Sequence, residues 1–442
     1  VYAVLLVMFG AASFYVKQRA MPQMNQMLEI TTFAKLFFLP AMFLVILRLV
    51  SADRKALPPL VVRAVYISAW VVVISVVLSY VTNTYNHTYD QPWAKIGVAG
   101  WFYSGNQQSL VLIALMPVLM IVSLRRKNIV IGLAAIAAAA GLLLFNGTRV
   151  AWVGWLTMGA LVLFLMLLPM RGRGFAWRDI VLMLVILAGL VAAVVFRGQL
   201  PIGSVNNQRQ SQLPGLDKTV EIYDEADSGG APAQFREDEY IIDVAGRYQL
   251  LIVPPLDEIR WESLTGTEAL AFERNLSRPD RTAFEFATAL EFSQKIGEST
   301  ARQRFDHRYR QRLFANTARQ HADIPIRLFG MPHQFYSEYI GDFETDYSFM
   351  YASYGLLGSM LFALVFVVET LRKARGVRCL SFKQLRSPHF VVPAYVFLMF
   401  MGAAFFAGRT FQQPAVSVYL AFSFAYLLTY YETLGGTGEK QI

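Results

Sequence analysis

Cysteine is almost absent from the 442-residue sequence, since Cys379 is its only example. A single cysteine excludes an intramolecular disulfide and a cysteine metal cluster. Charged residues are also scarce: Asp, Glu, Lys and Arg make up 16% of the chain, against roughly 25% in soluble globular proteins. The five histidines lack metal-ligand spacing, and Walker, nucleophile-elbow and dinucleotide motifs are missing. These absences exclude a secreted disulfide scaffold, a disordered chain and a soluble nucleic-acid binder.

Apolar residues fill the chain instead, at 55% of the sequence and with a mean hydropathy of +0.40. Several apolar runs reach the length of about 18–24 residues that a helix needs to cross a bilayer. The sequence therefore predicts an all-α polytopic membrane protein with about ten or more transmembrane helices. The ten predicted spans lie near residues 1–16, 30–50, 60–82, 107–124, 128–145, 149–170, 178–197, 348–371, 389–408 and 415–432.

The net charge of +9 indicates orientation rather than nucleic-acid binding, because Arg and Lys concentrate in cytoplasmic loops of membrane proteins. With ten spans, all four basic connections fall on one face, which places both termini in the cytoplasm. The basic connections are Arg54–Lys55, Arg125–Lys127, Arg171–Arg178 and Arg372–Arg386, and the predicted outer segments are 83–106, 146–148, 198–347 and 409–414.

Three regions follow from this topology. Residues 1–197 hold the first seven spans, residues 198–347 form an extracytoplasmic loop domain, and residues 348–442 hold the last three spans. Helix-forming residues prevail from about 236 to 315, so we expect the outer domain to be mostly helical.

Charges at the outer edge of a membrane bundle are costly and are usually functional. Arg149 in FNGTRVAW and Arg409 in FFAGRTFQQP occupy such positions. Either guanidinium could bind a lipid diphosphate bidentately, or could extend to the lipid headgroups. Asn106 in GWFYSGNQQS lies at the outer mouth of a span, where it could contact substrate or cap the helix.

The segment 301–327 carries seven arginines against two aspartates, which creates a positive field on the outer side. Arg308 and Arg310 are candidates for binding an anionic group there, although an arginine-rich helix face can also be simply solvated. Glu344 and Asp346 follow before the eighth span and could act as a general base or as ion-pair partners of the arginines. His333 is a further candidate base, or a structural histidine.

The order of these motifs resembles the bacterial O-antigen polymerase and O-antigen ligase superfamily. The resemblance rests on GWFYSGNQQS, on FNGTRVAW, and on a late outer loop with DHRYRQRLF, RLFGM, FETD and YGLLG. It implies an all-helical membrane glycosyltransferase of the bacterial inner membrane, with its active site facing the periplasm.

The resemblance also implies the chemistry. The donor and acceptor would be undecaprenyl-diphosphate-linked glycans, no metal or other cofactor would be needed, and a chain-length regulator or flippase would be a protein partner. Ligases of the lipopolysaccharide type carry a His-Asn pair about eleven residues before the Gly-x-x-Gly of the next span, where this chain has Glu344. That departure favours polymerisation of O-antigen, capsule or exopolysaccharide repeat units over ligation to a lipid A-core acceptor. Transport of lipid-linked glycans is a further alternative, which the scarcity of charges within the spans disfavours.

Overall fold

A computed structural model describes most of the chain outside the central part of the predicted outer loop. The described residues are 2–52, 57–91, 94–102, 104–167, 176–204, 282–297, 299, 307–340, 343, 345–378, 382–385, 387–406, 408 and 410–435. The chain divides into two compact units, Val1–Ala34 with Ser211–Leu364, and Lys35–Gln210 with Val365–Ile442.

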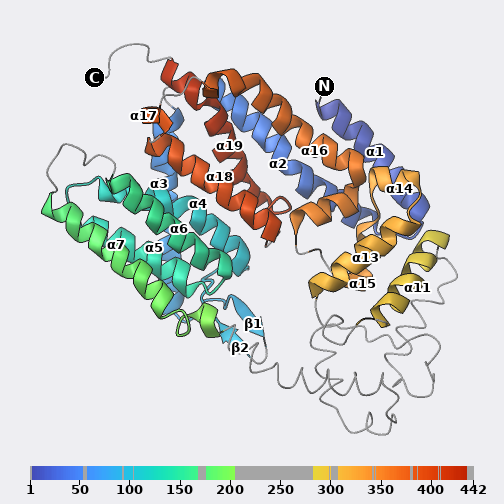
Figure 1. The fold of residues 1–442 in the computed structure, drawn as a ribbon, viewed down its shortest axis with the longest axis horizontal. Helices are drawn as coiled ribbons and strands as arrows, with labels where there is room; N and C mark the ends of the chain where they lie inside the picture. Colours follow the sequence, from blue (N-terminus) through green and yellow to red (C-terminus); the bar gives the residue numbers. More distant parts are fainter. Residues whose placement is uncertain are drawn as a thin grey trace, which may run out of the picture. The chain divides into compact units, whose positions relative to one another are not determined.

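The second unit is a bundle of apolar helices, as expected where lipid leaves backbone polar groups no partner outside their own helix. Its core helix is α4, which packs against α3, α5, α6, α18 and α19 (Figure 1). Within the apolar windows, 78% of the α4 residues are buried, against 17% in α3 and α7. The outer faces of α3 and α7 therefore suit contact with lipid. The bounds are α3 Leu57–Val81, α4 Gly105–Leu124, α5 Ile129–Phe145, α6 Arg149–Leu167, α7 Trp177–Val195, α17 Phe382–Leu385, α18 Pro388–Phe406 and α19 Pro414–Gly435.

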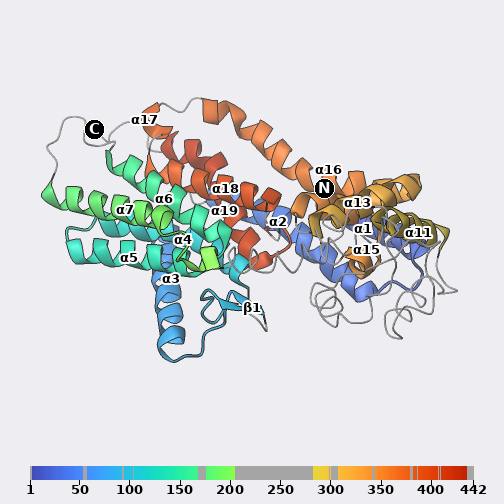
Figure 2. The ribbon, with the colours of Figure 1, turned by 60° about the horizontal axis from the view of Figure 1, so that its bottom comes forward.

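A short hairpin separates α3 from α4 in the polar segment that is predicted not to cross the membrane. Strands β1 (Tyr89–Gln91) and β2 (Ala94–Ile96) pair antiparallel, with Asp90 opposite Lys95. Figure 2 shows β1 following the end of α3. After the hairpin, the backbone N–H of Val98 donates to the carbonyl of Phe145 at 2.9 Å. This contact joins two segments that the charge pattern assigns to the same side of the membrane.

Two segments that are predicted to be cytoplasmic also contact each other. The guanidinium of Arg178 donates to the carbonyls of Arg126 at 2.7 Å and Leu124 at 3.1 Å, which ties the start of α7 to the turn after α4. In these two cases, segments predicted to lie on the same side of the membrane are in contact.

The first unit combines the ends of membrane helices with short polar helices. It contains α1 and the start of α2, the helices α11 and α13–α15, and the first part of α16. Packing joins α1 to α14, α11 to α13, and α13 to α15. The bounds are α1 Tyr2–Ala20, α2 Gln26–Ala52, α11 Ala283–Gly297, α13 His307–His321, α14 Ile324–Phe329, α15 His333–Ile340 and α16 Asp346–Arg378.

The all-α polytopic fold is confirmed, and each of the ten predicted spans overlaps a helix. Among the described residues, seven helices are long and apolar enough to cross a membrane: α2, α3, α4, α6, α7, α16 and α18. Helix α5 and the apolar part of α19 are shorter, and α1 ends in Lys17 and Arg19. Crossing by these last three helices stays a prediction. Within the described residues, β structure is confined to the hairpin and one isolated bridge.

Candidate functional site

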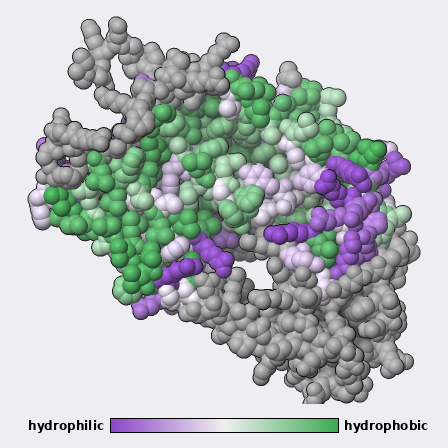
Figure 3. All heavy atoms as spheres, in the orientation of Figure 1, coloured by the Kyte–Doolittle hydropathy of each residue, from purple (hydrophilic) through white to green (hydrophobic). Residues whose placement is uncertain are grey.

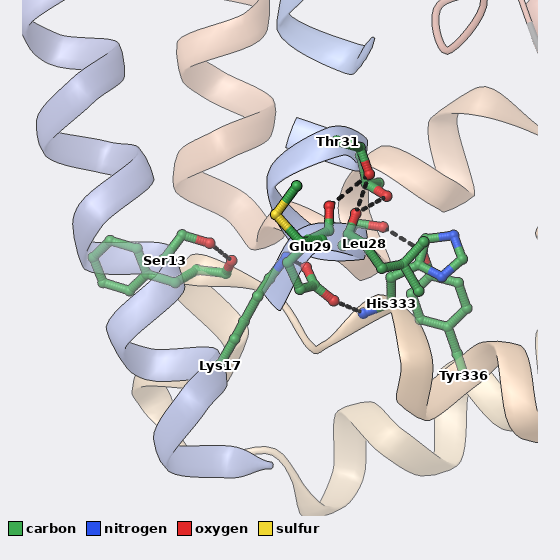
Figure 4. Close-up of polar contacts among 11 residues, drawn as sticks. Ser13, Lys17, Leu28, Glu29, Thr31, His333 and Tyr336 are labelled. Atoms are coloured by element: carbon green, nitrogen blue, oxygen red, sulfur yellow. Dashed lines mark hydrogen bonds and ion pairs between the residues drawn. The ribbon is translucent and has the colours of Figure 1, made fainter. Parts of the chain in front are cut away.

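A buried ion pair lies where α1 and α2 meet the segment before α15. Lys17 Nζ lies 2.8 Å from Glu29 Oε2, and their side chains are only 2% and 3% exposed. The other carboxylate oxygen of Glu29 accepts a hydrogen bond from the backbone N–H of His333 (Figure 4). Lys17 Nζ also lies 4.3 Å from the centre of the Tyr354 ring. One carboxylate therefore connects the first helical hairpin to the segment that carries the predicted base.

His333 begins α15 and packs among aromatic rings. Its ring centre is 4.9 Å from that of Tyr336 and 5.9 Å from that of Phe349. Tyr336 also shares a 2.7 Å hydrogen bond with Ser353, so α15 is fixed against the first turns of α16. Asp346 is the first residue of α16 and is completely buried. Two of the predicted acid–base residues thus lie on helices that pack directly together.

The arginine-rich segment forms α13, a helix held by apolar contacts to its neighbours. The Phe314 ring packs edge-on against Phe292 of α11, with 5.3 Å between ring centres, and lies tilted against Phe335 of α15 at 5.4 Å. Arg310 is only 4% exposed, and its burial lowers the pKa of its guanidinium. Arg308 lies in the same helix, but its side chain is outside the described residues.

Charged side chains also join the polar ends of α11 and α13. Glu291 lies 2.5 Å from Lys295 on its own helix and contacts His321 of α13. Its hydrogen bond with Lys295, aided by His321, lowers the pKa of the Glu291 carboxyl. These contacts join the polar ends of α11 and α13 through a single carboxylate.

Two neighbouring cavities open beside α13, α14 and α16. The first, of about 350 Å³, is lined by Asn316, Arg319, Gln320 and Arg327. The second, of about 190 Å³, shares three of these residues and adds Ser348, Tyr351 and an apolar wall. Figure 3 shows hydrophilic residues gathered over α13 and α14.

Glycines let α14 approach the backbone of α16. Gly330 has φ +88°, and a Cβ there would lie 2.3 Å from the Ser353 carbonyl carbon. Gly355 interrupts α16 with φ +61° and ψ −162°, and a Cβ there would lie 2.5 Å from the Leu328 carbonyl carbon. Positive φ values and contacts this close admit only glycine without strain. The cavity walls contributed by α14 and α16 are therefore fixed to each other.

A second polar cluster, in the other unit, surrounds the start of α6. Asn146 donates from Nδ2 to Gln108 Oε1 and accepts from Ser109 Oγ, both at 2.7 Å. Thr148 Oγ1 lies 2.5 Å from Ser109 Oγ and accepts from the Ala151 N–H at 3.0 Å, which is an N-cap arrangement. Arg149 follows directly, as the first residue of α6, and its side chain is exposed.

The remaining predicted site residues are either outside the described residues or exposed. Glu344 and Arg409 lie outside the described residues. Asn106 is exposed in the first turn of α4, where Ser104 occupies the N-cap position, so the capping role weighed for Asn106 is wrong. Among the described residues, no three His, Cys, Asp or Glu side chains are grouped to hold a metal ion.

Sequence reasoning missed two features. Lys17 and Glu29 lie just outside the predicted limits of the first two spans, so they are easily taken for loop charges. Their opposite signs at facing helix ends were the available signal. Gln108 and Asn146 belong to the two motifs quoted for the resemblance, but nothing in either motif shows that the two side chains meet across α4 and α5.

Comparison with known proteins gives one match. The model of a family described as O-antigen ligase like membrane protein matches residues 1–434, nearly the whole chain. No curated protein and no solved structure matches the chain.

Proposed function

The chain belongs to the O-antigen ligase-like membrane protein family, and from this premise we propose that it polymerises undecaprenyl-diphosphate-linked repeat units on the periplasmic side of the inner membrane. Members of this family are membrane enzymes that transfer glycans. The proposal adds the donor, the side of the membrane and the choice of polymerisation.

The observation that carries the proposal is the composition and packing of α13. Its 15 residues include four arginines and no acid, and it packs against α15, which begins with the candidate base His333. Positive charge and a proton acceptor are the two groups that glycosyl transfer from a diphosphate requires. Arg308 and Arg310 would bind the donor diphosphate. Arg149, Arg409 and Asn106 belong to the other compact unit and stay candidate substrate contacts on the sequence alone.

The proposed reaction is a displacement at the anomeric carbon of the donor. The acceptor hydroxyl forms the new C–O bond, the bond to the diphosphate breaks, and undecaprenyl diphosphate leaves with the electron pair. The hydroxyl proton passes to a base, for which Asp346, Glu344 and His333 are the candidates. The arginines stabilise the negative charge on the leaving diphosphate, a task for preorganised cations. No step in this scheme requires a metal ion.

Ligation is the second candidate, and the description of the matching family favours it. Glu344 at the position of the ligase His-Asn pair favours polymerisation. The acceptor distinguishes the two reactions, since a polymerase uses another lipid-linked glycan and a ligase uses a different lipid or polymer.

The test incubates the purified full-length protein, reconstituted in liposomes, with lipid-diphosphate-linked repeat units. A ladder of glycan lengths is expected. Transfer of one intact glycan to a lipid A-core acceptor, without a ladder, would identify a ligase instead. No transfer to either acceptor, from protein that remains folded, would contradict both candidates.

Substitutions test the site in the same assay. Arg310→Lys keeps the charge but loses the bidentate fork, and loss of such a contact from a transition state costs about 2–4 kcal/mol, or about 30- to 1000-fold in rate. Asp346→Asn should bind donor normally and turn over slowly if Asp346 is the base. Arg312→Lys, at an exposed position on the same helix, is the matched control and should retain its rate. Unchanged rates in Arg310→Lys and Arg149→Ala would contradict the proposed diphosphate contacts.

A further inference from the structure

The paired cavities beside α13 and α14 combine cationic, amide and apolar surfaces. Arg319, Arg327 and Asn316 line both cavities, Gln320 extends the larger, and among the described residues no carboxylate lines either one. Among the described residues, Arg319 and Arg327 form no ion pair. The guanidinium of Arg327 uses its Nε–H in a 2.9 Å hydrogen bond to the Ala322 carbonyl. The remaining N–H groups of both arginines can therefore serve a ligand.

The smaller cavity has the mixed character of a sugar site. Ile326, Met331 and Ala352 supply apolar surface, and Tyr351 adds an aromatic ring that is 39% exposed. The guanidinium of Arg319 lies 5.9 Å from the centre of that ring. A pyranose presents hydroxyls at its edge and C–H groups on its face, so it needs both kinds of wall. A diphosphate has no apolar face to place there.

Resting on the proposed function, we propose that these cavities bind an acidic sugar of the glycan, a hexuronate. Its carboxylate lies between Arg319 and Arg327, because a guanidinium matches a carboxylate with two parallel hydrogen bonds. Its ring lies against Tyr351 and Met331. Neighbouring sugars occupy the larger cavity, where the Asn316 amide can both donate to and accept from hydroxyls. The Gln320 amide, whose Oε1 accepts from Lys295 Nζ at 3.0 Å, can donate its N–H groups to them.

The backbone around the site favours selective binding. The Met331 N–H donates to the Ala352 carbonyl at 2.9 Å, and the contacts of Gly330 and Gly355 fix α14 against α16. Side chains from the two helices therefore face the ligand from a preformed frame, which lowers the entropy lost on binding. The substrate class that follows is an acidic polysaccharide.

The test measures binding of glycans to the purified full-length protein without any transfer step. The probes are oligosaccharides containing glucuronate and oligosaccharides containing galacturonate, each paired with its carboxyl-reduced form, which keeps the sugars and loses the charge. At least one acidic probe should bind about tenfold or more tighter than its reduced partner, as expected for charge-assisted hydrogen bonds. Arg319→Gln and Arg327→Gln should each remove that difference, and Arg312→Gln should keep it. Arg319→Lys, which keeps the charge but not the fork, should retain only part of it.

Other outcomes overturn the proposal. Equal binding of acidic and reduced probes by the wild-type protein would exclude carboxylate recognition. Inorganic pyrophosphate that binds more tightly than the acidic probes, and loses that binding in Arg319→Gln and Arg327→Gln, would make the cavities a phosphate site. The polymerisation assay keeps the two proposals separable. A glycan ladder without selective binding contradicts only the hexuronate site, and arginine-dependent binding without transfer contradicts only the polymerase.

Discussion

Lys17 and Glu29 are charges buried within the protein and compensated mainly by each other. Removing one partner leaves the other charge buried without compensation, which typically costs about 3–5 kcal/mol. Lys17→Met should therefore lower the free energy of unfolding by about that amount. Glu29→Gln should lower it by a smaller amount. The double variant should recover most of the loss. Thermal unfolding of the detergent-solubilised protein measures these differences.

Lys127→Met is the matched control for this residue, because Lys127 is exposed in the turn after α4. Surface substitutions usually change stability by less than about 0.5 kcal/mol. If Lys17→Met behaved like Lys127→Met, or if the two buried substitutions were additive, the pair would not carry the stability assigned to it.

Some residues of the candidate site can be identified from the sequence, and others only from the fold. The rarity of charge beside apolar spans identifies Arg149 and Asp346 as candidates, and the run of arginines in segment 301–327 identifies Arg310. Which arginines line a cavity depends on how α13 is rotated about its axis, and that rotation is set by Phe314 packing against α11 and α15. Partners far apart in sequence, such as Glu29 and His333, become visible only in the folded chain.

At the element scale, α16 combines two helical pieces joined at Gly355. Gly355→Ala would force a Cβ into the Leu328 backbone at a positive φ. A backbone with this φ and ψ is essentially confined to glycine and costs another residue about 1–3 kcal/mol, and overpacking typically adds about 1–3 kcal/mol. We expect a loss of about 2–6 kcal/mol in the free energy of unfolding, together with weaker binding in the α13–α14 cavities, in thermal unfolding and glycan-binding measurements.

Gly402→Ala provides the control, because Gly402 lies within α18 and a Cβ there meets nothing within 4 Å. Alanine favours a helix interior over glycine by about 0.8–1.0 kcal/mol, so this variant should be neutral or slightly more stable. A Gly355→Ala protein as stable as Gly402→Ala would show that the interruption in α16 relaxes without cost.

At the scale of the whole molecule, the apolar runs suffice to predict the helices, because lipid leaves each segment only its own backbone partners. Their count across the membrane is harder to predict, since α1 ends in charges and α5 is short. The β1–β2 hairpin escapes prediction because its segment has neither helical nor strand periodicity. Cys379 lies outside the described residues, as does part of the basic run around it that is predicted to be cytoplasmic.

Sidedness can be tested with the single native cysteine. An impermeant thiol reagent on intact spheroplasts should leave Cys379 unlabelled, because it lies in a basic connection predicted to be cytoplasmic. The Ile324→Cys protein should be labelled, since Ile324 is 73% exposed in α14 of the predicted outer domain. Permeabilised cells should label both positions. Labelling of Cys379 in intact spheroplasts, with protection of residue 324, would reverse the orientation.

The Gly-x-x-Gly at Gly355–Gly358 shows what a shared motif can say about family membership. A Cβ at Gly358 would lie 2.7 Å from the Phe9 ring, and one at Gly355 would enter the backbone of α14. At both positions the close approach of a neighbouring segment accounts for the glycine. Relatives that join different sugars to different acceptors can therefore share this signature. A motif of this kind reports ancestry well and substrate poorly, and enzymes of this lineage are better told apart by the side chains that line their cavities.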